Sequence, residues 1–400
     1  MPRAVQAAAP KPLDAFIALC GETAWSGRMA ALAGRMQPGS LSARAAQHRH
    51  ALELALARMA DGRALARAAP AEQRLCGFAR DAVALAETLP PAARERLRAR
   101  LQAGLTGEAT LLPLFHLLRT AARLRAQGFA LRFDGLAEEA PYDLLARRGG
   151  ATAEVVCETV SAEEGRPVHR GDWLALVDRI HPELQTWLAA HPGRYLLKLT
   201  LPEGISGPEQ LAGLQQRISE MLAAEKRQDA GADAMLKLDP LVLAGAQLQD
   251  APSGLPARLR QIFGHEAHLA VTTEASSGSV FAMAARAGRG NEISGAVCRR
   301  LTATAAARLS GQHPGILAVF LEEVERGEWR ALREELELEG AVRRWFTGAA
   351  AAGVVAVSCT SRFEMFGAAD AAGEEELRFR NPRHPAARHP DLSPAILSSL

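Results

Sequence analysis

Apolar residues recur every three or four positions through the first third of the chain. This period, with charged residues between the apolar ones, predicts amphipathic helices. Ser40 can cap one helix that stops near residue 61, and further helices are expected over residues 71–89, 91–104 and 108–127. The first third is therefore expected to be all-helical.

Alternating and continuous apolar runs then predict strands among further helices. Strands are expected over residues 129–133, 153–160, 194–200, 268–273, 279–285, 316–324 and 353–359, and helices over 173–190, 208–226, 291–309 and 329–346. Strands that alternate with helices indicate an α/β or α+β fold, with a mixed central sheet flanked by helices. The residues from about Asn381, rich in Pro and His, are expected to form a poorly ordered tail.

Length and cysteine usage exclude several classes of protein. A chain of 400 residues allows two or three domains and a core that needs no covalent crosslink. The five cysteines are widely spaced and form no CxxC pair, which argues against a disulfide framework and against a zinc knuckle. No run of about eighteen uncharged apolar residues occurs, so a membrane span is not expected. A cytoplasmic location is the simplest expectation.

The charge balance does not indicate a generally basic protein. The sequence contains 47 Lys and Arg against 45 Asp and Glu, for a formal net charge of +2. The abundance of Arg and Ala is typical of a GC-rich bacterial genome. Arginines gather over residues 94–100 and 119–132, where a solvated helix face is the favoured interpretation and a nucleic-acid contact the alternative.

The most informative stretch runs from Pro141 to Arg170, PYDLLARRGGATAEVVCETVSAEEGRPVHR. Two glycines after a short apolar run predict a β-hairpin turn, and residues 153–160 then alternate. Because alternate residues of a strand share a face, Glu154, Val156 and Glu158 are expected to project to one side. Asp143, on the preceding strand, is expected to face the same set.

This layout resembles the PD-(D/E)XK superfamily, the restriction-endonuclease-like fold. In that family an Asp begins one strand, an acid and a Lys lie two apart on the next, and the three residues bind Mg²⁺ and activate water. Asp143 matches the Asp, whereas Val156 and Glu158 stand in the positions of the acid and the Lys. A shifted alignment places Glu154 at the acid and leaves Val156 at the Lys, so neither restores the motif.

The resemblance implies a nuclease-related site with altered chemistry. Asp143 with Glu158, and with Glu154, can be expected to hold Mg²⁺ or Mn²⁺ if the protein is active; otherwise no cofactor is expected. The chain has Lys only at positions 11, 198, 226 and 237, none of them near this motif. Arg166, His169 and Arg170 are the expected nucleic-acid-binding residues, although Arg is a poor proton donor because it stays ionised.

Three functions remain open from the sequence. The first is a degenerate, inactive nuclease-fold protein that binds nucleic acid, DNA or RNA, or a protein partner. The second is an active metal-dependent nuclease with a rearranged site, and the third is an assembly protein that docks or oligomerises through its N-terminal helices. The expected domains are a helical one over residues 1–110, a restriction-endonuclease-like region over 111–365, and a strand remnant and flexible tail over 366–400.

Overall fold

The computed structural model describes residues 12–36, 39–60, 67, 70–205, 207–241, 255–264, 266–274, 277–361 and 376–399. The chain has a mixed α/β fold that begins with a helical region, as the sequence predicts, but it contains two mixed sheets and not one central sheet. It forms two compact units. Unit 1 comprises residues 1–36, 46–161 and 294–400, and unit 2 comprises residues 37–45 and 162–293.

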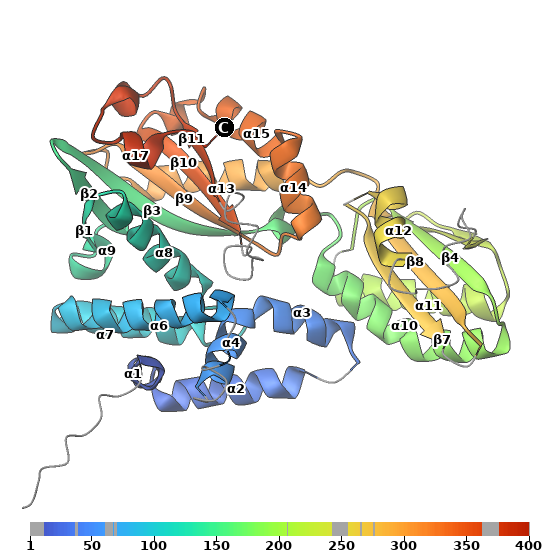
Figure 1. The fold of residues 1–400 in the computed structure, drawn as a ribbon. Helices are drawn as coiled ribbons and strands as arrows, with labels where there is room; N and C mark the ends of the chain where they lie inside the picture. Colours follow the sequence, from blue (N-terminus) through green and yellow to red (C-terminus); the bar gives the residue numbers. More distant parts are fainter. Residues whose placement is uncertain are drawn as a thin grey trace, which may run out of the picture. The chain divides into compact units, whose positions relative to one another are not determined.

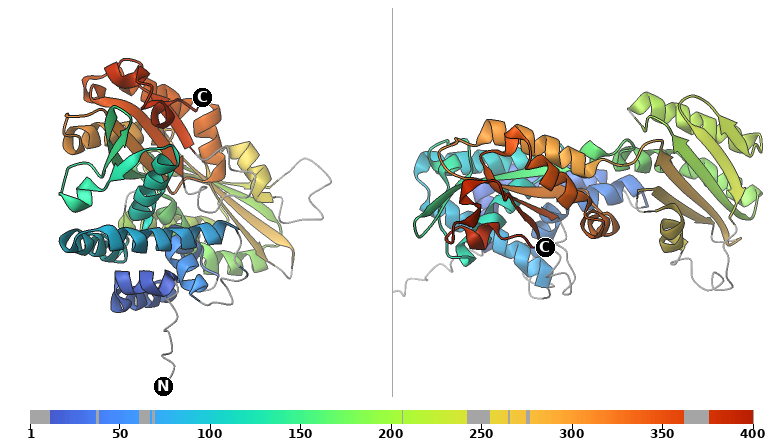
Figure 2. Two further views of the ribbon diagram at one scale, coloured as in Figure 1. Left: turned by 60° about the vertical axis from the view of Figure 1, so that its left-hand side comes forward. Right: turned by 90° about the horizontal axis from the view of Figure 1, so that it is seen from above.

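Unit 1 is built on a six-stranded sheet of order β1-β2-β3-β9-β10-β11. Its strands are β1 Ala130–Arg132, β2 Leu144–Arg148, β3 Ala151–Ser161, β9 Gly315–Glu322, β10 Val354–Ser361 and β11 Glu376–Arg380. The pairs β3–β9 and β9–β10 are parallel, and the other pairs are antiparallel. In Figures 1 and 2 the green strand β3 lies beside the orange strand β9, although all of residues 162–293 separate them in sequence.

The β2–β3 hairpin is confirmed, with Arg148 opposite Ala151. Gly149 has φ of 53°, and a Cβ atom there would lie 2.5 Å from the Asp391 carboxylate, so the turn requires glycine. Asp391 also accepts a hydrogen bond of 3.0 Å from Gly150 N. The Gly149–Gly150 turn, held by Asp391, thus fixes the register of β3, the strand that carries Glu154 and Glu158.

The helices of unit 1 come from both ends of the chain. They are α1 Pro12–Cys20, α2 Glu22–Arg35, α4 Ala51–Met59, α6 Pro70–Thr88, α7 Pro91–Gly104, α8 Leu112–Ala126, α9 Asp134–Ala137, α13 Ile293–Arg308, α14 Arg326–Glu334, α15 Glu337–Trp345 and α17 Ser393–Ile396; α3 Leu41–Arg49 crosses the boundary between the units. Helix α8 packs on β3 through the face that carries Val155, whereas the side chain of Glu158 meets α13. Because successive side chains of β3 point to opposite faces, α8 and α13 contact opposite faces of this strand.

The N-terminal helices share one core with the sheet, so residues 1–110 are not a separate domain. A row of four aromatic rings connects the helices to the sheet. The distance between ring centroids is 5.5 Å from Phe16 to Phe78, 5.7 Å from Phe78 to Phe115, and 6.5 Å from Phe115 to Phe320. These rings come from α1, α6, α8 and β9. The expected boundary near residue 110 fails because the apolar face of the helices is buried against α8 rather than within a bundle.

The C-terminal part of unit 1 departs from expectation in two places. The helix expected over residues 329–346 is two helices, since Leu336 between them adopts a positive φ of 55°. Strand β11, which pairs with β10, lies where a strand remnant is expected, whereas the tail expected to be poorly ordered from about Asn381 contains helix α17, where Ile396 is fully buried. Apolar residues spaced between the prolines supply this packing. The expected boundary at residues 365 and 366 lies outside the described residues.

Unit 2 has its own five-stranded sheet of order β5-β6-β4-β8-β7. Its elements are α10 Arg170–Ala190, β4 Arg194–Leu201, α11 Pro208–Ala223, β5 Gln228–Ala230, β6 Met235–Pro240, α12 Leu255–Phe263, β7 His268–Glu274 and β8 Ser279–Ala287. Helices α10 and α11 cover one face in a core around Trp173, and Leu259 of α12 packs on the other. The hairpin β7–β8 is confirmed. The expected single α/β region over 111–365 is thus interrupted by a second compact unit.

Candidate functional site

Asp143 lies at the start of the β2–β3 hairpin, directly before β2. Its backbone N donates to Val155 O at 3.0 Å, and its Oδ2 accepts from Cys157 N at 2.9 Å. The side chain is 6% exposed. The hairpin therefore holds this carboxylate against the middle of β3, as the alternation in the sequence predicts.

Glu158 projects from β3 toward helix α13. Its Oε2 accepts a hydrogen bond of 3.1 Å from Thr304 Oγ1, and its Oε1 lies 3.9 Å from Arg300 Nη1. Both partners stand on α13, one helical turn apart. Glu158 and Asp143 are thus brought to one place, and both have partners on α13.

Arg308, the last residue of α13, lies between the two acids. Its Nη2 is 2.8 Å from Asp143 Oδ1, and its Nη1 is 3.7 Å from Glu158 Oε2 and 3.4 Å from Cys157 O. The Nε donates to Pro141 O at 3.1 Å. One guanidinium therefore gathers two carboxylates and two carbonyls, and it neutralises the charge of both acids.

The residues present do not fit a divalent cation. Mg²⁺ requires about six oxygens at about 2.1 Å, and here the oxygens surround a permanent organic cation. Val156, which stands where the resemblance would require an acid, has an apolar side chain that is fully buried. Within the described parts of the chain, no group of three or more His, Cys, Asp or Glu side chains is placed to bind a metal.

Glu154 has a different role from its neighbours. It is fully buried, and it accepts hydrogen bonds from Ser310 N at 2.8 Å and from the Ser310 hydroxyl. Ser310 lies in the turn between α13 and β9. The carboxylate thus fixes this turn, and these contacts commit it to the backbone rather than to a ligand.

A cleft of about 620 Å³ opens beside Asp143 and Glu158 in unit 1. Three arginines and four carboxylates line it: Arg49, Arg100, Arg308, Glu108, Asp143, Glu158 and Glu322. Its other lining residues are Ala103, Gly104, Ala109, Thr110, Leu111, Pro113, Leu114, Leu117, Cys157 and Thr159, most of them apolar and supplied by α7, α8 and the loop that joins them. The cleft therefore has one apolar side and one side of mixed charge.

No known protein family, curated protein or solved structure matches this chain.

Side chains from the N-terminal helices hold the loop between α7 and α8. Arg28 donates to Gly107 O at 2.6 Å and to Ala109 O at 2.5 Å, and its Nη2 lies 2.9 Å from His50 Nδ1. The carboxylate of Glu53 accepts from Leu111 N at 2.8 Å. A buried polar cluster beneath the loop therefore shapes the rim of the cleft.

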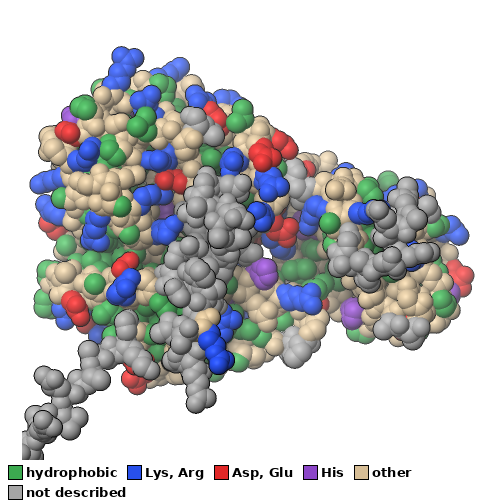
Figure 3. Space-filling model, viewed as in Figure 1, with side chains coloured by type: hydrophobic (Ala, Val, Ile, Leu, Met, Phe, Trp, Pro, Cys, Tyr) green, Lys and Arg blue, Asp and Glu red, His purple; other side chains and the backbone are tan. Residues whose placement is uncertain are grey.

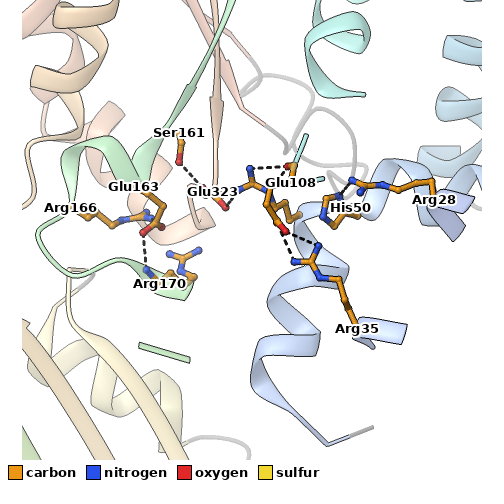
Figure 4. A network of polar contacts seen from close by, with 10 residues as sticks. Arg28, Arg35, His50, Glu108, Ser161, Glu163, Arg166, Arg170 and Glu323 are labelled. Atoms are coloured by element: carbon orange, nitrogen blue, oxygen red, sulfur yellow. Dashed lines mark hydrogen bonds and ion pairs between the residues drawn. The ribbon is translucent and has the colours of Figure 1, made fainter. Parts of the chain in front are cut away.

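A second set of contacts holds the same loop from its exposed side. Arg35 forms an ion pair of 2.9 Å with Glu108, and Arg49 bridges Glu108 O, at 3.2 Å, to the Glu323 carboxylate, at 2.6 Å. Glu323 also accepts a hydrogen bond of 2.5 Å from Ser161 Oγ at the end of β3. Figure 4 shows this set beside Arg28 and His50. The loop is thereby tied to the ends of β3 and β9.

Burial dominates the ionisation of this cluster. Desolvation, with help from the nearby charge of Arg28, lowers the pKa of His50 to about 4, so the ring is neutral at pH 7. Burial raises the pKa of Glu53 above its ordinary value, and the hydrogen bond from Leu111 opposes this effect. His116 on α8, whose Nε2 lies 2.9 Å from Ala318 O, also has its pKa lowered to about 4 by burial.

The residues expected to bind nucleic acid belong to unit 2, whereas Asp143 and Glu158 belong to unit 1. Arg166 has a fully buried side chain that pairs with Glu163, so it offers no surface to a polyanion. Arg170 N donates to Glu163 at 2.7 Å and begins helix α10. His169 is 51% exposed and lies 3.9 Å from Asp172. The contacts of these residues stabilise the start of helix α10.

The arginine clusters of the helices are also largely structural. Arg94 donates to Ala86 O at 2.8 Å, Arg96 donates to Leu136 O at 2.7 Å, and Arg123 pairs with Glu376 at 2.8 Å. The expected solvated helix face does not account for the hydrogen bonds that Arg94 and Arg96 donate to backbone carbonyls. Figure 3 shows basic and acidic side chains interspersed over the face in view, rather than one basic patch.

Two further facts bear on the class of protein. No helix in the part of the chain that the structure describes has both the length and the apolar character needed to cross a bilayer. All five cysteines are unpaired, and burial strongly raises the pKa of the Cys157 and Cys359 thiols. Cys157 is partly buried and packs against the core of unit 1, and its raised pKa disfavours the thiolate.

Proposed function

We propose that this chain is a divergent restriction-endonuclease-like protein that binds nucleic acid without cleaving it. The position of Arg308 carries the proposal, because its guanidinium lies between Asp143 and Glu158. The resemblance assigns a divalent cation to this neighbourhood. In this chain the guanidinium of Arg308 supplies the positive charge between the two acids instead of a cation.

Arginine can replace the charge of a metal but not its chemistry. A guanidinium with a pKa above about 12 stays protonated, so it neither activates water nor donates a proton to a leaving oxygen. It also cannot dissociate, whereas a metal exchanges with solvent. Asp143 and Glu158 are consequently held in ion pairs, and the sequence supplies no lysine within the Pro141–Arg170 stretch to stabilise a developing phosphate charge.

Two alternatives are less well supported. An active nuclease needs Glu154 as a ligand, but the hydrogen bonds of Glu154 to Ser310 commit this side chain to a turn. An assembly module formed by the N-terminal helices needs an apolar face for its partner, but residues such as Phe16 and Phe78 bury that face against α8. Unpaired cysteines support a reducing compartment, and we place the protein in the cytoplasm.

The test is to incubate the purified full chain with labelled single-stranded and duplex DNA and RNA in Mg²⁺ and in Mn²⁺. Binding and cleavage are scored on the same samples, with Asp143→Ala as the paired variant. We expect binding without cleavage. Cleavage by the wild type that disappears in Asp143→Ala would establish an active nuclease and overturn the proposal, and so would a lack of binding to every nucleic acid.

A further inference from the structure

The cleft beside Arg308 has two sides of different chemistry. Pro113, Leu114 and Leu117 of α8, with Ala103 of α7, supply an apolar side. Pro113 and Ala103 are exposed, so a ligand can reach this side without displacing the core. Such a surface suits the flat, weakly polar face of a ring.

On the charged side, Arg100 is the arginine held most loosely. Its contacts to Asp143 and to Gly135 O measure 3.4 and 3.5 Å, near the limit for a hydrogen bond, and its side chain is 43% exposed. Arg308 and Arg49, in contrast, make bonds of 2.6–2.8 Å to Asp143 and Glu323. Arg100 can therefore turn its guanidinium to an incoming anion at little cost.

Arg100 and Ala103 stand three residues apart on α7, so they share one face of the helix and both meet the cleft. An anionic group at Arg100 would place an attached ring beside Ala103 and the α8 wall. A nucleotide carries both groups, because a sugar connects its anionic phosphate to the ring of its base.

We infer that the cleft binds one unpaired nucleotide of a single-stranded nucleic acid, with the phosphate at Arg100 and the base against the apolar side. This inference rests on the proposed function and specifies its ligand. The cleft volume of about 620 Å³ lies within the range of small-ligand sites and suits one nucleotide rather than a duplex. A base inside a duplex is stacked and paired, so it cannot enter a pocket without leaving the helix.

The charges around the cleft limit it to a single phosphate. Glu108 and Glu322 lie on the same lining as Arg49, and they would repel neighbouring phosphates. The cleft is therefore suited to a strand end or to a base that is turned out of a strand, rather than to a long backbone track.

The experiment measures fluorescence anisotropy of the full-length protein with a labelled single-stranded decanucleotide and with the blunt duplex of the same sequence. We expect the single strand to bind at least about tenfold more tightly, and Arg100→Gln and Ala103→Trp each to weaken it at least about fivefold. Arg330→Gln and Ala92→Trp are the matched controls, because both positions are exposed and lie outside the cleft lining. The controls are expected to bind like the wild type.

The outcomes separate the inference from the function on which it rests. Equal affinity for duplex and single strand, or wild-type binding by both cleft variants, would overturn the inference and leave a non-cleaving nucleic-acid-binding protein. No binding to any nucleic acid, or cleavage that depends on Asp143, would overturn the proposed function itself. Thermal unfolding of each variant shows whether it is folded. If Ala103→Trp does not fold, Arg100→Gln still tests the inference, because Arg100 is exposed and its replacement does not disturb the core.

Discussion

The Nη2 atom of Arg308 lies 2.8 Å from Oδ1 of Asp143, a carboxylate whose side chain is 6% exposed. The same arginine ends helix α13, and it also approaches Glu158 and the carbonyl of Cys157. The ion pair ties the crossover helix to the hairpin. Its removal would leave a nearly buried carboxylate with only the long contact to Arg100 as a charged partner among these residues.

Arg308→Ala is expected to create affinity for Mn²⁺ that the wild type lacks. The substitution frees the two carboxylates and two carbonyls that the guanidinium now gathers, and these are ligands that hard cations accept. We expect a loss of about 1–3 kcal/mol in the free energy of unfolding, partly restored by Mn²⁺. Isothermal titration with Mn²⁺ checks the first point and urea unfolding the second.

Arg300→Ala is the control for this prediction, since Arg300 contacts Glu158 at 3.9 Å. We expect it to bind no Mn²⁺, because Arg308 remains in place. A folded Arg308→Ala protein with no Mn²⁺ binding would show that these oxygens do not form a cation site even when freed.

Glu154→Ala is expected to lower stability without changing ligand binding. The substitution leaves Ser310 N and its hydroxyl without their acceptor, at a cost of about 2 kcal/mol. Glu138→Ala, at a side chain 62% exposed, is expected to change stability by less than about 0.5 kcal/mol. Urea unfolding and nucleic-acid anisotropy are measured on both. Loss of binding in folded Glu154→Ala would instead place this carboxylate in the ligand site.

Stability is expected to fall as the pH is lowered from about 6.5 toward 4. His50 and His116 have pKa values lowered to about 4 in the folded chain, so each takes up a proton on unfolding in this window. The cost reaches about 3 kcal/mol for each histidine. Glu53 acts oppositely: its raised pKa contributes stability at low pH that is lost as the pH rises through the folded value.

Urea unfolding at pH 7, 6, 5 and 4.5 measures this dependence. His116→Gln is expected to flatten the slope, since it removes one titrating group while keeping a donor for Ala318 O. An unchanged slope in both His116→Gln and His50→Gln would assign the acid sensitivity to other groups.

Arg28→Met is expected to loosen the loop between α7 and α8. The side chain is buried and donates to Gly107 O and Ala109 O, so its loss leaves two carbonyls unsatisfied and costs about 3 kcal/mol. Hydrogen exchange of residues 105–111 is expected to accelerate. Arg35→Met, at an exposed ion pair with Glu108, is the control, with an expected cost below about 1 kcal/mol. Unchanged exchange in Arg28→Met would contradict this role.

The affinity for a single strand is expected to depend weakly on salt. One phosphate contact gives a slope of log K against log salt concentration of about −0.7. Anisotropy titrations from 50 to 200 mM salt measure it. A slope of about −4 or steeper would indicate a long basic track, which the interspersed charges in Figure 3 do not offer on the face shown.

The local pattern of the sequence predicts the elements that surround the site, but not their assembly. Alternation along β3 and the glycine turn place Asp143 and Glu158 together correctly. Arg308 could not be found this way, because it lies far along the chain and a helix end carries no signal of what it contacts. The same holds for Glu154: its strand position is predictable, but its bond to Ser310 depends on how β9 joins β3.

Domain boundaries were predicted poorly for a related reason. An amphipathic helix shows which face is buried but not against what, so the burial of Phe78 on Phe115 could not be distinguished from packing within a bundle. The order of the tail from about Asn381 does not follow from its composition, because Pro and His dominate it, although Leu392 and Ile396 are buried.

The parallel pairing of β3 with β9 has a consequence for synthesis on the ribosome. When Ser161 has been made, β3 has its antiparallel neighbour β2, but its other edge lacks a partner until Gly315 to Glu322 emerge. All of residues 162–293 are translated in between. During that interval an apolar strand edge is open to mispairing, and unit 2 has time to fold before the sheet of unit 1 closes. Nascent chains stalled before β9 are therefore expected to aggregate more readily than the complete chain.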